Sequence, residues 1–260
     1  MKLFKLLTHL FFIVFLTAIT QVGGIIWILS ILTSYKIKKR KRLVFPLLYL
    51  TFNLFIIPPL AKSFGREQLP VFNEELKPRN WIYPLLFRNY VSKKLKTELE
   101  NASVVLSKSN ISITYLDANF PFLDGFPLLP HLSHNDGKKV DLSFMYLDKN
   151  KNSTDKKPSV SGYGVYVNQE NNDMSKSCII KGYWQYDFSK YLTFGKIDDL
   201  TLDENKTIHL IKELLHNNLT QKIFIEPYLK ASLGLSSENK IRFHGCQAVR
   251  HDDHIHLQIK

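Results

Sequence analysis

The C-terminal stretch RHDDHIHLQIK, Arg250 to Lys260, alternates histidine with aliphatic residues in its second half. This period of two predicts a β-strand over 253–259, because successive side chains of a strand point to opposite faces. His254 and His256 would then share one face, roughly 6–7 Å apart along the strand. With His251, this short stretch holds three of the nine histidines in the chain, which points to a functional site beside the strand.

Upstream of this stretch, the spacing of apolar residues predicts further elements. We expect strands at 111–119, 140–147, 177–188 and 222–229, and helices at 89–109 and 203–218. The second helix has the clearest pattern, because Asp203 stands at its N-cap position and aliphatic residues recur on one side. Residues 148–177 are polar and predict an excursion that holds at most a short hairpin. Together these elements predict an α+β domain around a small antiparallel sheet, with flanking helices and long loops.

A second histidine-bearing stretch, HLSHNDGKKVD, runs from His131 to Asp141. A catalytic zinc site needs three protein ligands and one position open to water. His134, Asp141 and one C-terminal histidine supply such a set, and Gly137 permits the tight reversal that brings the first two together.

The two histidines of the predicted strand cannot easily both join one tetrahedral site, given their spacing along it. One of them would bind the metal. Its neighbour would then act as a general base or stabilise negative charge on the reacting carbonyl oxygen.

The N-terminal part has the composition of a membrane anchor. Residues 6–35 contain no charged side chain, and a second uncharged run covers 43–61. Each is long enough to cross a bilayer. We therefore predict a two-helix membrane anchor over 1–65 and an extracytoplasmic domain over 66–260. A cleaved signal peptide remains an alternative for the first run, and a membrane-surface segment remains one for the second.

Positive charge predicts the orientation of this anchor. The segment KIKKRKR, 36–42, carries six basic residues, more than Lys2 and Lys5 at the N-terminus. Basic loops stay in the cytoplasm, so the segment should lie inside and both ends of the hairpin outside. The domain would then face the extracytoplasmic space.

The net charge of +12 does not indicate a nucleic-acid-binding protein. Residues 1–66 hold ten basic and no acidic side chains, and the remainder holds 25 basic and 23 acidic ones. The folded part therefore lacks the basic excess that tracks a phosphate backbone. The only cysteines, Cys178 and Cys246, either pair in an oxidising compartment or stay as separate buried thiols.

The strings SHNDGKKVD and RHDDHIHLQI resemble the LAS metallopeptidases, most closely the penicillin-insensitive murein endopeptidases. Those enzymes carry H-x-x-H-x-x-G-x-x-V-D followed by a late H-D-x-H-x-H, and both patterns are present here. The resemblance implies a LAS or hedgehog-like fold. Its expected zinc ligands are His134, Asp141 and His256. It assigns catalysis to His254, with His131 and His251 lining the site.

The same resemblance implies hydrolysis of peptide bonds in peptidoglycan, with stem or cross-link peptides as substrates. The likeness covers about twenty residues, and the chain shows no arginine just upstream of His131 to hold a substrate carboxylate. We therefore expect a zinc endopeptidase that cuts cross-links. The alternatives are a D,D-carboxypeptidase and a non-enzymatic zinc-binding recognition domain of the same fold.

Several other side chains attract attention without deciding a function. Asp252 and Asp253 would either orient ligand histidines or lie in an exposed turn. We expect Asp117 and Asp136 to stay away from the site. Three histidines are predicted to lie on the surface: His209, His216 and His244. Three aromatic residues are predicted to belong to the core rather than to a substrate-binding surface: Tyr183, Trp184 and Tyr186.

Overall fold

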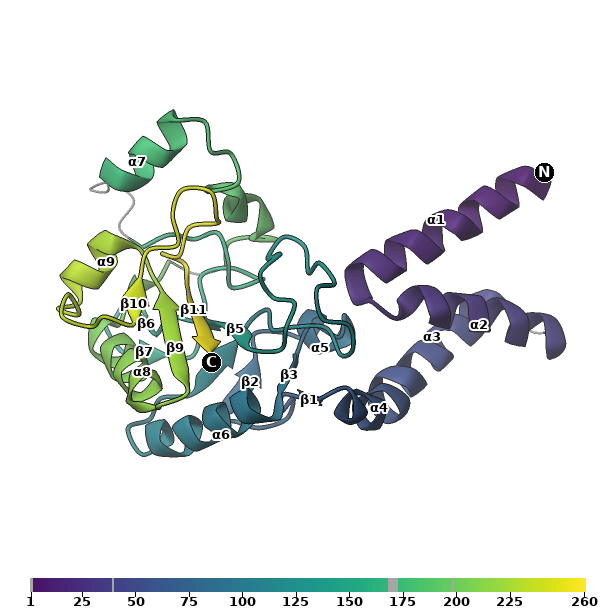
Figure 1. Cartoon of the computed structure of the whole chain (residues 1–260), viewed down its shortest axis with the longest axis horizontal. Helices are drawn as coiled ribbons and strands as arrows, with labels where there is room; N and C mark the ends of the chain where they lie inside the picture. Colours follow the sequence, from purple (N-terminus) through teal and green to yellow (C-terminus); the bar gives the residue numbers. More distant parts are fainter. Residues whose placement is uncertain (1, 39, 168–172, 198) are drawn as a thin grey trace.

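The computed structural model describes residues 2–38, 40–167, 173–197 and 199–260. An α/β body formed by the teal to yellow part of the chain lies at one end of the molecule. A group of apolar helices, purple and blue, projects from one side of this body (Figure 1).

The body is built on a six-stranded sheet in the order β10-β9-β11-β5-β4-β2. The strands are β2 (Leu76–Pro78), β4 (Ile113–Tyr115), β5 (Lys139–Ser143), β9 (Thr220–Phe224), β10 (Ile241–Arg242) and β11 (His254–Ile259). The C-terminal strand β11 lies inside the sheet, antiparallel to both β5 and β9. The pairs β2–β4 and β9–β10 are parallel. The predicted antiparallel sheet is therefore confirmed at its centre, and the edge pairings differ from the prediction.

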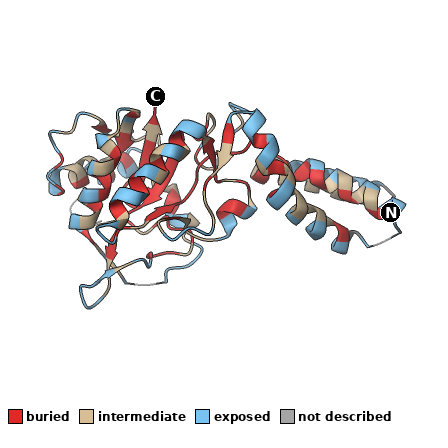
Figure 2. Ribbon diagram, turned by 90° about the horizontal axis from the view of Figure 1, so that it is seen from below, coloured by how far each residue is buried: buried red, intermediate tan, exposed pale blue. Residues whose placement is uncertain are grey.

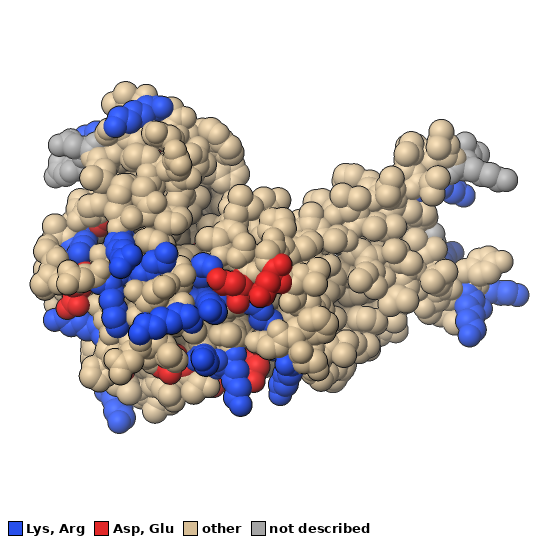
Figure 3. Space-filling view, viewed as in Figure 1, with Lys and Arg blue, Asp and Glu red and all other residues tan. Residues whose placement is uncertain are grey.

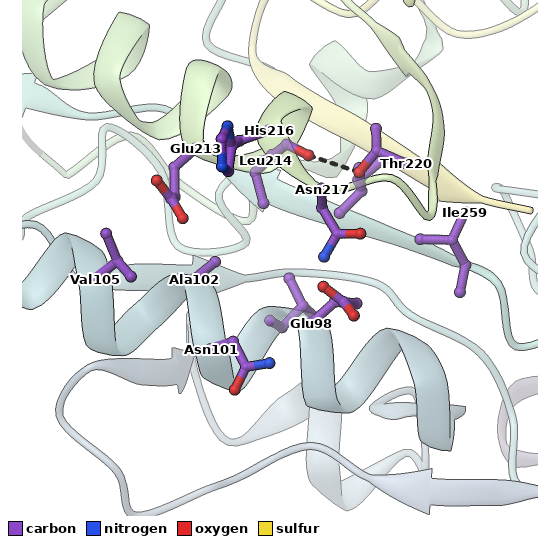
Figure 4. Close-up of a pocket in the computed structure, with 12 residues that line it drawn as sticks. Glu98, Asn101, Ala102, Val105, Glu213, Leu214, His216, Asn217, Thr220 and Ile259 are labelled. Carbon is purple, nitrogen blue, oxygen red and sulfur yellow. Dashed lines mark hydrogen bonds between the residues drawn. The ribbon is translucent and has the colours of Figure 1, made fainter.

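Two helices cover one face of this sheet: α6 (Lys93–Ser107) and α8 (Glu204–His216). The backbone N–H of Leu95 donates to Ser92 at the start of α6, and that of Lys206 donates to Asp203 at the start of α8, so both predicted helices have N-caps. Leu257 and Ile259 of β11 line a shallow groove between the helices (Figure 4). This face is the hydrophobic core of the body.

Loops and short elements make up the rest of the body. They include α5 (Ile82–Leu85), α7 (Asp173–Ile180), α9 (Pro227–Ser232) and η3 (Phe188–Leu192). The short strands are β1 (Arg66–Gln68), β3 (Tyr90–Ser92), β6 (Tyr146–Leu147), β7 (Ser153–Thr154) and β8 (Thr201–Leu202). The strand predicted at 177–188 is wrong. Residues up to Ile180 belong to α7, and a disulfide between Cys178 and Cys246 ties that helix to the chain before β11.

The N-terminal part forms α1 (Lys2–Thr20), α2 (Gly23–Lys36), α3 (Lys41–Thr51), the π-helix η1 (Phe52–Ile56) and α4 (Ile57–Ser63). Two helical stretches, Leu3–Thr20 and Arg42–Ser63, are long and apolar enough to cross a membrane. Only 6% and 17% of these windows are buried, unlike the core helices of a soluble protein.

The first apolar run is not the single span that we predicted over 6–35. It breaks at Gln21, which has a φ of 66°, and α2 folds back along α1. A Cβ on Gly23 would come within 2.6 Å of Thr20 Oγ1, and one on Gly24 within 2.6 Å of the Ile13 carbonyl oxygen. The two glycines thus allow a close helix–helix contact.

This reversal changes the topology of the anchor. The N-terminal end of α1 and the connection between α2 and α3 form two separate tips, both at the end of the helices away from the body (Figures 1 and 3). The predicted hairpin has the N-terminus opposite the basic segment, whereas the extra reversal brings the two to the same end of the helices.

The helices and the body share a small hydrophobic core, visible as buried positions at their junction (Figure 2). Ile26 and Ile57 from the helices pack in one cluster with Phe87, Tyr90 and other residues of the body. Gln21 Oε1 also accepts a hydrogen bond of 2.9 Å from the backbone N–H of Phe122. The helices therefore support the loop that leads to His131.

Candidate metal centre

The sheet brings two of the predicted ligands face to face. His256 on β11 lies directly opposite Asp141 on β5 and Phe224 on β9. Their neighbours Leu257 and Val140 point to the other side, into the core under α6 and α8. The alternation seen in the sequence therefore places the ligands on the face that the loops cover.

A tight turn brings His134 to the same point. Gly137 has a φ of 74° and reverses the chain between His134 and Asp141, as predicted. The Arg66 guanidinium fills the space where a Cβ on this glycine would lie. The Nδ1–H of His134 donates to the Ala118 carbonyl at 2.7 Å, which leaves the Nε2 lone pair free for a metal.

Three potential ligand atoms converge at one point. His134 Nε2 lies 3.0 Å from His256 Nδ1 and 3.2 Å from Asp141 Oδ1, and the last two atoms are 2.9 Å apart. All three side chains are buried. These residues can hold a metal ion, since their ligand atoms lie within 4.8 Å of one another. Two imidazoles and one carboxylate form a donor set that suits zinc.

The ionisation states also suit metal binding, which requires neutral imidazoles and an ionised carboxylate. Burial lowers the pKa of His256 to about 3 against the opposing effect of Asp141, so this ring is neutral at pH 7. Burial raises the pKa of Asp141, but His134 and His254 outweigh it and hold that pKa well below its usual range.

His254 differs from its neighbour on the same strand face. Burial opposes its protonation, but the carboxylates of Asp141 and Asp253 raise its pKa to about 9. Its Nδ1 bonds to Asp253, whose other oxygen accepts the Gly164 N–H at 2.6 Å. Asp253 is thus a buried partner that orients a histidine. Asp252 is also buried, but it pairs with Arg250 instead.

His131 stands on the other side of Asp141. Its Nδ1 lies 3.0 Å from Asp117 Oδ2 and 3.3 Å from Asp141 Oδ2. Arg88 holds Asp117 through two hydrogen bonds of 2.5 and 2.7 Å. The prediction that Asp117 stays away from the site is therefore wrong. Asp136 bonds to Lys139 and Lys138 on the surface.

Three histidine nitrogens beside Asp141 have no hydrogen-bond partner within the described residues: His131 Nε2, His254 Nε2 and His256 Nε2, all buried. His131, Asp141 and His254 form a second group with ligand atoms close enough for a metal. It shares Asp141 with the first group, and buried nitrogens of this kind are expected to bind a ligand, water or ion.

Tyr163 is a site residue that sequence reasoning missed. Its hydroxyl donates to Asp141 Oδ2 at 2.8 Å and accepts the Asp117 N–H at 3.2 Å. Burial and the nearby Asp141 raise its pKa well above the usual value, so it stays a donor. It lies in the excursion predicted at 148–177, of which 168–172 are outside the described residues. The apolar segment YGVYV inside that polar stretch was the available signal.

His251 and His244 complete one wall of the site. The His251 ring centroid lies 4.9 Å from that of His254 and 5.5 Å from that of His244. Burial, followed by repulsion from His254 and His256, holds the pKa of His251 well below its usual value. His244 stacks near Phe224, at 4.3 Å between centroids, and lines the cleft. It was predicted to be a surface histidine, and it is both exposed and part of the site.

A cleft of about 650 Å³ opens onto these histidines. Leu129 and Leu132 line one side, and Trp184 and Phe188 line the other. Trp184 is 74% exposed, so the prediction that it belongs to the core is wrong, whereas Tyr186 is fully buried and bonds to Glu226. Two residues of the metal-ligand cluster, His134 and His256, therefore line a mostly apolar cleft.

No protein-family model matches the chain, and no curated protein matches its sequence.

Proposed function

We propose that this protein is a membrane-anchored zinc peptidase. The observation that carries the proposal is the convergence of His134 Nε2, Asp141 Oδ1 and His256 Nδ1 within 3.2 Å at the base of an open cleft. A structural metal site is usually closed by four protein ligands. Here the ligands His134 and His256 line a cleft, and His131 and His251 line it beside them.

Zinc held by these ligands would act as a Lewis acid and lower the pKa of water toward 7. The chain supplies the remaining chemistry. His254, charged at neutral pH and held by Asp253, donates its Nε2–H toward negative charge that develops on the scissile carbonyl oxygen. It can also pass a proton to the leaving amine. His131 and His251 flank the same space.

We propose peptidoglycan stem or cross-link peptides as the substrate. Support comes from the resemblance of HLSHNDGKKVD and RHDDHIHLQI to the murein endopeptidases. The placement of the site agrees with it, since the disulfide Cys178–Cys246 is typical of an oxidising compartment. The basic far end of the helices favours a body outside the cytoplasm. We place the protein in the bacterial cytoplasmic membrane, with its site in the periplasm.

Two alternatives make different demands on the site. A D,D-carboxypeptidase needs a cation for the terminal carboxylate of its substrate. Arg88 lies near His131, but its guanidinium already forms an ion pair with Asp117. This argues against carboxypeptidase activity. A recognition domain with a structural metal does not require the unpartnered nitrogens of His131 and His254, so we prefer hydrolysis.

The experiment that tests this function uses the full chain in detergent or nanodiscs with purified peptidoglycan of several cross-link chemistries. Released muropeptides are read by mass spectrometry, with a chelated sample and the His254→Ala variant alongside. We expect cleavage that requires both the metal and His254. The masses of the released muropeptides should identify the bond that is cut. A zinc-loaded, folded protein that cleaves none of the cross-links would instead favour the recognition domain.

A further inference from the structure

The α/β body is bonded to the side of a candidate membrane span, not only to its end. Tyr49 Oη donates to the Leu85 carbonyl at 2.7 Å, and Asn53 Nδ2 donates to the Pro84 carbonyl at 2.9 Å. Asn53 is 3% exposed. These bonds fix α5 against α3 and η1, inside the stretch Arg42–Ser63.

The position of these bonds along the span sets the height of α5. Asn53 precedes the end of the span at Ser63 by ten residues, which is roughly 15 Å of helix. The hydrocarbon core of a bilayer is about 30 Å thick. If Arg42–Ser63 crosses it with the basic segment inside, then Asn53 and the α5 backbone bonded to it lie within the outer leaflet, close to the middle of the hydrocarbon core.

The surface at this level is apolar and exposed. Phe72 is 85% and Trp81 is 57% exposed, and their rings contact each other edge to face, 5.3 Å apart between centroids. On the neighbouring helix, Leu54 is 56% and Phe55 is 71% exposed. Exposed apolar patches of this kind mark interaction sites, and tryptophan is enriched where a protein meets the headgroups.

A groove of about 590 Å³ runs between the span and the body. Its apolar wall includes Leu50 and Leu54 from the helix, and Leu69, Phe72, Trp81 and Leu85 from the body. Lys96 also lines it, but its ammonium group is 3.3 Å from Glu67. The groove therefore offers apolar surface and a compensated charge, which suits an acyl chain better than an anionic headgroup.

We propose that this groove binds an acyl chain of an outer-leaflet phospholipid. The side of the body that carries α5 would then be embedded in the outer leaflet. The proposal needs only that Arg42–Ser63 spans a bilayer, and it stands whether or not the site hydrolyses peptides.

The three tryptophans of the chain provide the test. Trp27 lies in α2, Trp81 beside the groove and Trp184 at the cleft. Three variants that each retain one tryptophan, with phenylalanine at the other two positions, are placed in nanodiscs. Quenching of their fluorescence is measured with lipids brominated near the headgroup or deep in the acyl chain. Circular dichroism and zinc content confirm that each variant is folded.

We expect quenching of Trp27 and Trp81, with Trp81 quenched at least as strongly by deep as by shallow bromines. Trp184 should not be quenched. Brominated phosphatidylcholine and phosphatidylglycerol should act equally on Trp81. Quenching of Trp27 without Trp81 would overturn the proposal, as would quenching of Trp81 by the anionic lipid alone. Absence of quenching for both Trp27 and Trp81 would mean that the helices do not enter the bilayer and would overturn the proposal too.

Discussion

His254 and His256 share one face of β11, yet their surroundings give them opposite charge states. The carboxylates of Asp141 and Asp253 raise the pKa of His254 to about 9, against the effect of burial. Burial lowers the pKa of His256 to about 3, and the carboxylate of Asp141 opposes this shift. A neutral ring suits a metal ligand and a charged ring suits a proton donor, so the two histidines should respond differently to mutation.

Replacing His256 by alanine should abolish stoichiometric zinc binding, whereas His254→Ala should retain zinc and lower turnover by about 10²–10⁴-fold. Zinc content is measured by mass spectrometry and turnover by muropeptide release. His209→Ala, an exposed histidine on α8, is the matched control. Loss of zinc in the His254 variant, or unchanged turnover, would contradict these roles.

Tyr163→Phe should weaken zinc binding by about 10–100-fold, the usual effect of removing a partner of a metal ligand. The phenol donates to Asp141 Oδ2, and the variant keeps the ring. Competition with a chelator of known affinity gives the dissociation constant. An unchanged constant would show that Asp141 does not depend on this hydrogen bond.

Lys157 should cause the free energy of unfolding of the body to rise with pH in the alkaline range. It is buried beside the Phe144 carbonyl, and burial lowers its pKa to about 8 from the usual 10.5. Between these values the native state binds fewer protons than the unfolded state, so stability rises with pH. From pH 8 to pH 10 the free energy of unfolding should rise by about 2 kcal/mol relative to Lys157→Met. If the free energy of unfolding changed with pH in the same way in the unmodified protein and in Lys157→Met, the expectation would be refuted.

Sequence reasoning found the site residues that lie close to one another in the sequence. His134 and Asp141 lie on one turn, and His254 and His256 alternate on one strand, so their proximity could be predicted. Asp117, Tyr163 and His244 reach the site only through the tertiary fold, and no local pattern marks them as polar partners. Asp253 was among the candidates because it adjoins His254 in sequence.

At the scale of elements, the turn before β5 depends on one glycine. Gly137→Ala should lower the free energy of unfolding by more than the 1–2 kcal/mol expected for a left-handed residue. Its Cβ would also overlap the Arg66 guanidinium, 1.8 Å from Nη1. Gly125→Ala is a matched control, with a φ of 79° and no atom within 4 Å of its Cβ. Equal destabilisation of both variants would mean that Arg66 moves away freely.

Alternation and helical periodicity predicted β11, β5, α6 and α8, because each buries one face against the same core. The strand predicted at 177–188 failed, since the short apolar segment CII does not distinguish a strand from the helix α7. The prediction of a single membrane span over 6–35 was wrong, because hydropathy does not reveal that the chain reverses at Gln21. Gly23 and Gly24 were the only local sign of the close contact there.

At the scale of the whole molecule, the helices and the body fold around a shared cluster. Removing residues 1–65 would expose Phe87, Tyr90, Phe120 and Leu128, all buried against the helices or beside them. We expect the fragment 66–260 to aggregate, while the full chain stays monodisperse in detergent. Light scattering of both preparations measures this. A soluble, monomeric fragment that binds zinc would show that the body folds without its anchor.

The most direct test of the central claim, that His134, Asp141 and His256 form a catalytic metal centre, is a metal titration of the full-length apoprotein. Bound zinc and peptidoglycan cleavage are measured in the same samples. We predict that cleavage rises in proportion to zinc and saturates at one equivalent, and that His256→Ala shows neither. Zinc bound at one equivalent without cleavage, or cleavage independent of zinc, would contradict the account.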